Sequence, residues 1–124
     1  MREIKFRGSP IEDYADLKWF EGGIYLNQDD RLAYINTDYS GVVPVHWDSV
    51  GQFTGLKDRN GVEIYEGDIY HQGDPEIIYL VVWHDTGLQG KQIRSSNYAG
   101  LSYWKDRIEV IGNIYENPEL LTEK

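Results

Sequence analysis

Histidine and carboxylate side chains are the residues of this sequence that could most readily bind a metal or transfer protons. His46, His71 and His84 each have an aspartate nearby in the sequence, but none has the HExxH spacing of a zinc-binding helix. Three carboxylates lie within residues 63–68, whereas glycosidase-type catalysis needs two carboxyl groups at a set separation in a cleft. We therefore predict no catalytic residue and no metal site.

Glycine-rich and nucleophile motifs are the next source of possible chemistry. The segment GLKDRNG at 55–61 lacks the GxxxxGK[ST] order of a phosphate-binding loop, and no predicted helix follows it. Serine and threonine occur without a GxSxG context, and the chain has no cysteine. The sequence therefore predicts a non-enzymatic protein without a cofactor.

Charge and hydropathy limit the partners that the chain can have. The formal net charge is −9, which disfavours nucleic acid as a partner because duplex DNA is itself a polyanion. An acidic surface could instead mimic DNA and occupy a host DNA-binding protein. No apolar run reaches the length of about 18–20 residues that a membrane span needs, and the N-terminus lacks a signal-peptide pattern. We expect a soluble, cytoplasmic protein without a membrane partner.

One stretch of the chain, residues 86–107, combines basic residues with aromatic ones. Small β-barrels bind peptides or bases on exposed aromatic side chains, and this stretch contains a polar segment that favours exposure. The predicted binding surface comprises Lys91, Arg94, Tyr98, Tyr103, Trp104, Lys105 and Arg107.

Short strands are predicted in the first part of the chain. Residues 2–7 alternate with a period of two, which places Ile4 and Phe6 on the buried side of a strand and the charged residues on the exposed side. Residues 19–26 and 31–35 are strand-like runs around a polar four-residue connector, which predicts a hairpin.

The segment GQFTGLKDRNGVEIYEGDIY at 51–70 is predicted to be scaffold and not a site. Asp58, Asn60 and Gly61 form a tight reversal, because the aspartate carboxylate can bind backbone amides and the next residues tolerate positive φ. Gly67 and Asp68 are predicted to bend the chain into the next strand, with the carboxylate of Asp68 bound to backbone amides.

The most apolar run of the sequence follows at residues 77–83 and is predicted to be a central strand. Residues 88–100 are polar and are predicted to be the least structured part of the chain, with a short strand at 91–94. A further short strand is predicted at 101–104.

The last strand is predicted at residues 108–115, with Ile108, Val110 and Ile114 on one face. Asn117 is then expected to cap a short helical turn that begins with a proline.

These segments predict a mostly β protein with two parts. A smaller antiparallel β lobe comprises residues 1–49, and a small SH3-like β-barrel comprises residues 50–124 and ends in the short helical turn.

Several segments resemble the YopX family of phage and prophage proteins. They are REIKFRG at 2–8, WFEGGIYL at 19–26, VGQFTGLKDRNGVEIYEGDIY at 50–70 and IEVIGNIYENPELL at 108–121. The resemblance implies an SH3-type barrel in the C-terminal half and a cytoplasmic accessory role in a phage or prophage. It supplies no catalytic or binding residues. Tyr70-His71 departs from the apolar-then-basic pair of relatives, so a charge-based role there does not carry over.

The function predicted from these observations is protein–protein contact. Tyrosine and tryptophan, which are abundant here, are favoured at interfaces. The partners expected are further copies of the chain, as a dimer or a higher oligomer in which strand 2–7 takes part, and a host or phage protein. The alternative is a nucleic-acid-binding barrel that uses the basic and aromatic residues of 91–107.

Overall fold

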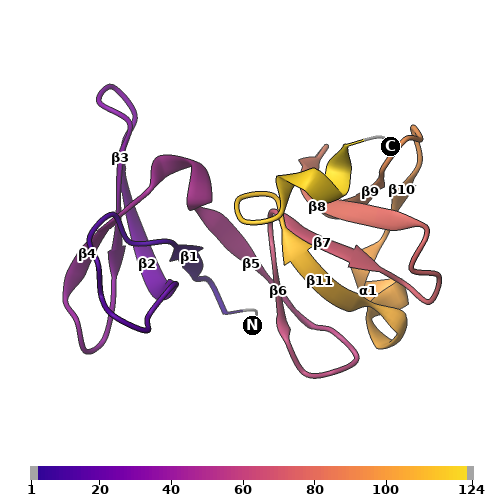
Figure 1. Ribbon diagram of the computed structural model, residues 1–124, viewed down its shortest axis with the longest axis horizontal. Helices are drawn as coiled ribbons and strands as arrows, with labels where there is room; N and C mark the ends of the chain where they lie inside the picture. Colours follow the sequence, from indigo (N-terminus) through magenta and orange to yellow (C-terminus); the bar gives the residue numbers. More distant parts are fainter. Residues whose placement is uncertain (1–2, 123–124) are drawn as a thin grey trace. The chain divides into compact units, whose positions relative to one another are not determined.

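Antiparallel β-strands dominate the computed structural model, which describes residues 3–122 (Figure 1). The strands are β1 (Phe6–Gly8), β2 (Phe20–Asn27), β3 (Leu32–Asn36), β4 (Val42–Val45), β5 (Gly51–Lys57), β6 (Glu63–Tyr65), β7 (Asp68–His71), β8 (Ile78–His84), β9 (Gly87–Gln92), β10 (Tyr98–Ala99) and β11 (Glu109–Asn113). One short helix, α1 (Leu101–Trp104), and 3₁₀ turns at Trp47–Ser49, Lys105–Arg107 and Pro118–Leu121 complete the described elements.

The chain divides into two compact units, Met1–Phe53 and Thr54–Lys124. The domain boundary predicted from the sequence, between residues 49 and 50, lies slightly before the boundary between these units. The predicted domains 1–49 and 50–124 remain a prediction. No helix in the described part of the chain is long and apolar enough to span a membrane.

The first unit is built on β1 to β4 and the start of β5, in the order β4-β3-β2-β1-β5. The predicted hairpin is confirmed, because β2 and β3 pair from Gly23↔Asn36 to Asn27↔Leu32. The core of this unit consists of buried side chains from β2, β3 and β4: Phe20, Ala33, Ile35, Val43 and Val45.

The predicted strand 2–7 is wrong in its bounds, and its predicted buried face is right at Phe6, which packs against the core, but wrong at Ile4 and Lys5. Residue 2 lies outside the described residues, and the strand that forms is β1 (Phe6–Gly8). Ile4 is 72% exposed, whereas the side chain of Lys5 is only 15% exposed. The Lys5 ammonium lies 4.9 Å from the centroid of the Phe53 ring and 3.4 Å from Glu21, so a cation–π contact and an ion pair hold the lysine against the unit.

The second unit contains a five-stranded antiparallel sheet in the order β10-β9-β8-β7-β11. The prediction that 77–83 forms a central strand is confirmed, since β8 lies in the middle of this order. The outermost strands, β10 and β11, do not pair with one another within residues 3–122, so no closed barrel is found there. A mostly β fold with two antiparallel sheets is confirmed, and the SH3-like barrel is not.

Two predictions within this unit are wrong. Residues 88–100 are not largely irregular, because β9 pairs with β8 along its whole length, from His84↔Gly87 to Tyr79↔Gln92. Pairing to an apolar neighbour strand thus outweighs the polar composition of β9. Residues 101–104 form the helix α1 and not a strand, and the buried Leu101 anchors that helix in the core.

The end of the chain follows its prediction only in part. β11 contains a bulge between Val110 and Gly112, which ends the period-two pattern and leaves Ile114 43% exposed, so the predicted common face with Ile114 is wrong. Pro118–Leu121 forms the expected turn as a 3₁₀ helix. Asn117 does not cap it with its side chain, because the Asn117 Oδ1 accepts a hydrogen bond from the Asn113 backbone N.

Candidate binding site

The segment from α1 to the following 3₁₀ turn brings together two of the predicted aromatic side chains. Trp104 is partly buried against the core that includes Leu101, Tyr79 and Tyr70. Tyr103 is 83% exposed, and its ring lies edge-on to the Trp104 ring with the centroids 5.0 Å apart. One aromatic ring is thus anchored against the core, and the second lies beside it in solvent.

Two hollows share the side chains of Trp104 and Arg107. One, of about 400 Å³, is lined by Gln72, Gly73, Asp74, Ile77, Tyr79, Trp104 and Arg107. The other, of about 390 Å³, is lined by Tyr103, Trp104, Asp106 and Arg107. We call these two together the Trp104 hollow. Its walls combine aromatic rings with a guanidinium group, the side chains that most often dominate protein–protein binding energies.

Charges in the Trp104 hollow are mixed. Within residues 3–122, neither the Arg107 guanidinium nor the Lys105 ammonium forms an ion pair, and Asp74 and Asp106 supply carboxylates to the lining. The Oε1 atom of Gln72 is buried without a hydrogen-bond partner in the described part of the chain. The hollow therefore offers the Arg107 guanidinium as a cation that no carboxylate of the described residues pairs with.

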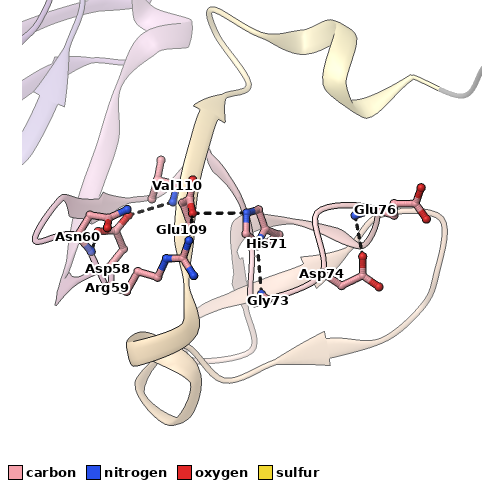
Figure 2. A network of polar contacts seen from close by, with 9 residues as sticks. All are labelled: Asp58, Arg59, Asn60, His71, Gly73, Asp74, Glu76, Glu109 and Val110. Carbon is pink, nitrogen blue, oxygen red and sulfur yellow. Dashed lines mark hydrogen bonds and ion pairs between the residues drawn. The ribbon is translucent and has the colours of Figure 1, made fainter.

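A network of polar contacts holds the loop that lines this hollow (Figure 2). The buried His71 accepts a hydrogen bond at Nδ1 from the Gly73 backbone N, at 3.2 Å, so its proton lies on Nε2. His71 Nε2 lies 3.8 Å from Glu109 Oε1, and Arg59 pairs with the same carboxylate. Glu109 thus links the turn at Arg59 to the start of the loop 72–76. Sequence reasoning missed this role of His71, since no spacing pattern marks it.

The remaining members of the predicted binding surface lie elsewhere or have other contacts. The Lys91 ammonium donates to the Ser95 carbonyl at 3.2 Å, and Tyr98 stacks on His84 with the ring centroids 3.8 Å apart. Arg94 donates to the Thr122 carbonyl and lines a different groove, of about 780 Å³, with Ile78, Ile111 and Leu120 among its neighbours. The structure therefore brings together Tyr103, Trp104 and Arg107, with Lys105 in the same turn, but not the full predicted surface.

The predicted structural turn has a defined geometry. The buried Asp58 carboxylate accepts hydrogen bonds from the backbone N atoms of Asn60 and Val62 at Oδ1, at 2.8 and 2.9 Å. Gly61 has φ of 81° and Gly67 has φ of 92°, both in the left-handed region. The buried Asp68 accepts a hydrogen bond from the Tyr65 backbone N at 2.7 Å.

The histidines do not form a metal centre in the described part of the chain. No group of three or more histidine and carboxylate side chains lies close enough there to hold an ion. His84 lies 3.5 Å from Asp85 but stacks on Tyr98, and His71 is occupied by the network described above.

Comparisons with known proteins place the chain in a family. The model of the YopX protein family matches residues 5–122, nearly the whole chain. The crystal structure of protein EF1440 from Enterococcus faecalis is similar over 98% of this chain and 100% of that one, with a TM-score of 0.54 and 24% identity. At that identity the likeness shows a shared fold and no more. No curated protein matches the chain. The chain belongs to the YopX family.

Proposed function

We propose that this protein is a non-enzymatic accessory protein that acts by binding another protein through the Trp104 hollow. The observation that carries the proposal is the 83% exposed Tyr103 ring, which stands beside the partly buried Trp104 in a hollow that Arg107 also lines. A tyrosine has only two side-chain torsions, so the exposed Tyr103 ring loses little conformational freedom on binding, which favours affinity.

The wider setting of the proposal comes from the family. Its resemblance to phage and prophage proteins supports an accessory role in the cytoplasm of a bacterial host, with a host or phage protein as the partner. The SH3-like barrel stays a proposal for the second unit, supported by the small antiparallel sheet and its bulged outer strand β11. Self-association, as a dimer or a higher oligomer, is part of the same proposal.

Nucleic acid is the disfavoured alternative. Of the basic residues predicted to bind it, Lys91 and Arg94 have contacts with carbonyl groups of the chain, and the net charge of −9 opposes approach to a polyanion. The DNA-mimic alternative is supported by that net charge alone.

Affinity capture from a bacterial lysate with three immobilised proteins tests the proposal. They are the wild type, Tyr103→Ala, and Tyr39→Ala as a control, because Tyr39 is fully exposed in the other unit. We expect a protein that the wild type and Tyr39→Ala retain and that Tyr103→Ala loses. The captured protein is then purified, and its affinity should fall about 10-fold or more with Tyr103→Ala and with Arg107→Ala.

Two results would contradict this function. One is a captured protein whose affinity is the same for the wild type and for the Tyr103 and Arg107 variants. The other is tight, salt-sensitive binding of single-stranded or duplex oligonucleotides in fluorescence anisotropy that is lost in Lys105→Glu/Arg107→Glu, which would favour the nucleic-acid alternative.

A further inference from the structure

The loop after β7, residues 72–76, lines the Trp104 hollow and is tied to the sheet through His71. Gln72, Gly73 and Asp74 are among the residues that line the hollow. The Gly73 backbone N donates a hydrogen bond to His71 Nδ1 at 3.2 Å. Gly73 has φ of 123°, a conformation that residues with a side chain rarely adopt. The imidazole ring of His71 thus holds an unusual backbone conformation in the wall of the hollow.

His71 itself is fixed by the strands on either side of it. It lies opposite the uncharged Ile78 of β8 and opposite Glu109 of β11, and its side chain is only 9% exposed. Its Nε2 lies 3.8 Å from Glu109 Oε1, while its Nδ1 is turned to Gly73 (Figure 2). The ring therefore has one nitrogen toward β11 and the other toward the loop.

The hydrogen bond from Gly73 requires a neutral imidazole. A neutral ring has one nitrogen that accepts a hydrogen bond, whereas a protonated ring has two N–H donors and no acceptor. Histidine is the side chain whose charge ordinarily changes between about pH 5 and about pH 8. A proton on the Nδ1 of His71 removes the acceptor and sets two donors, Nδ1–H and the Gly73 N–H, against one another.

The charged groups around the ring act at its other nitrogen. Glu109 of β11 faces Nε2, and Arg59, in the turn after β5, pairs with the same carboxylate. The carboxylates of Asp74 and Glu76 in the loop lie away from the imidazole (Figure 2). Protonation of His71 therefore turns its contact with Glu109 into an ion pair, while the contact with the loop is lost.

We propose that His71 is a pH-sensitive switch of the Trp104 hollow. With a neutral ring, Nδ1 binds the Gly73 amide and keeps the loop 72–76 in the conformation that lines the hollow. With a protonated ring, His71 stays with Glu109 and releases Gly73, so the wall that the loop supplies changes its shape. As a regulator of partner binding the switch rests on the proposed function, whereas the change of the hollow itself does not.

NMR spectroscopy of the full chain between about pH 8 and about pH 5 tests the switch without any partner. At the upper pH, the nitrogen signals of the His71 ring should show Nδ1 without a proton and Nε2 with one. As the pH falls, the amide signal of Gly73 and the indole N–H signal of Trp104 should shift along the same titration curve as the His71 ring.

The variant His71→Asn separates the hydrogen bond from the proton. The asparagine Oδ1 occupies the place of Nδ1 along the side chain and accepts a hydrogen bond, but it takes up no proton. In this variant the Gly73 and Trp104 signals should no longer follow the pH. His84→Asn is the matched control, because His84 lies at the other end of β8 and contacts Tyr98 instead. It should keep the wild-type titration of Gly73.

A binding measurement extends the test to the protein that the wild type captures. Between about pH 7.5 and about pH 5.5 the affinity of the wild type should fall about 3-fold or more beyond that of His71→Asn, since one hydrogen bond in the wall of the hollow is lost. Groups of the partner that titrate are common to both measurements, so their effects cancel in the comparison.

Several results would overturn the switch. They are a His71 ring that keeps one charge over the whole pH range, a Gly73 amide that does not follow that ring, and a Gly73 titration that persists in His71→Asn. A proton on Nδ1 at the upper pH overturns it in the wild type alone, even where the variant does not fold. An equal change of affinity in both proteins overturns the regulation of binding. Failure of the capture experiment with Tyr103→Ala overturns the proposed function and leaves the NMR results as they are, so the two proposals fail separately.

Discussion

The Oδ2 atom of Asp58 lies 3.0 Å from the backbone N of Val110 and accepts its hydrogen bond, although 52 positions of sequence separate the two residues. The other oxygen of the same carboxylate closes the turn by accepting the amides of Asn60 and Val62. One buried side chain thus shapes the turn after β5 and fixes β11 against it. The Arg59–Glu109 ion pair and the hydrogen bond from the Arg59 backbone N to the Ile108 carbonyl join the same turn to the last strand.

We expect Asp58→Ala to lower the free energy of unfolding by about 2–3 kcal/mol. The substitution leaves three backbone amides without their acceptor in part-buried positions, and each lost hydrogen bond has a cost of its own. Urea denaturation measures the loss. Asp74→Ala is the control, because its exposed carboxylate accepts one amide, from Glu76, and its loss should be below about 1 kcal/mol. Equal stabilities of the two variants would remove the structural role of Asp58.

Gly61→Val should destabilise the protein by about 1 kcal/mol or more through backbone strain alone. Gly61 has φ of 81°, while an added Cβ would meet no atom within 4 Å, so steric crowding contributes nothing. Gly87→Val is the matched control, because that glycine also has open space but no positive φ. Thermal melts compare the two, and a melting temperature of Gly61→Val equal to that of Gly87→Val would show that the turn does not need a glycine.

The hairpin of β2 and β3 and the central strand β8 could be predicted because each rests on a local signal. A polar connector of turn residues lies between two strand-like runs, and β8 is the longest apolar run in the chain. The turn at Asp58 was predicted for the same reason. Its hydrogen bond to Val110 was not, since nothing near Asp58 in the sequence marks a partner in β11.

The errors concern segments whose structure depends on distant residues. β9 has a polar sequence, but its whole length pairs with β8, and its Gly90 leaves room for the Tyr70 hydroxyl. Lys5 is held against the first unit by Phe53 and Glu21. The period-two pattern of residues 2–7 does not predict these contacts, because both partners lie far away in the sequence. Of the residues that line the Trp104 hollow, the sequence predicted Tyr103, Trp104 and Arg107 as part of a binding surface. It did not predict Gln72 and Tyr79, which come from other parts of the second unit.

Gly90→Ala should be strongly destabilising, by about 3 kcal/mol or more, because of Tyr70. An added Cβ would lie 1.7 Å from the Tyr70 Oη, and Tyr70 is fully buried. Tyr70→Phe alone should be neutral or stabilising, since the Oη is buried and has no hydrogen-bond partner in residues 3–122.

The double variant Tyr70→Phe/Gly90→Ala should recover part of the loss. The nearest remaining ring atom, Cζ, would still lie 2.8 Å from the added Cβ, so recovery is incomplete. A double-mutant cycle in urea measures the coupling between the two sites. Additive losses would mean that the Tyr70 hydroxyl does not fill the space above Gly90.

Tyr70 should also make the protein less stable at alkaline pH. Burial, and to a lesser degree the neighbouring Tyr79, raises the pKa of Tyr70 well above its usual value of about 10. The folded chain therefore keeps this proton at pH values where the unfolded chain has released it. The contribution is complete below a pH of about 10 and is lost as the pH rises further, by up to about 1.4 kcal/mol per pH unit.

Urea unfolding of the wild type and of Tyr70→Phe at pH values of about 8 and about 11 measures this contribution. The other nine of the ten tyrosines are common to both proteins, so their effects cancel in the difference. Tyr103→Phe is the control, because the Tyr103 side chain is exposed and should show the wild-type pH dependence. The stability of Tyr70→Phe should fall less than that of the wild type between the two pH values. An identical fall in both proteins would mean that the Tyr70 proton is released as easily in the folded chain as in the unfolded one.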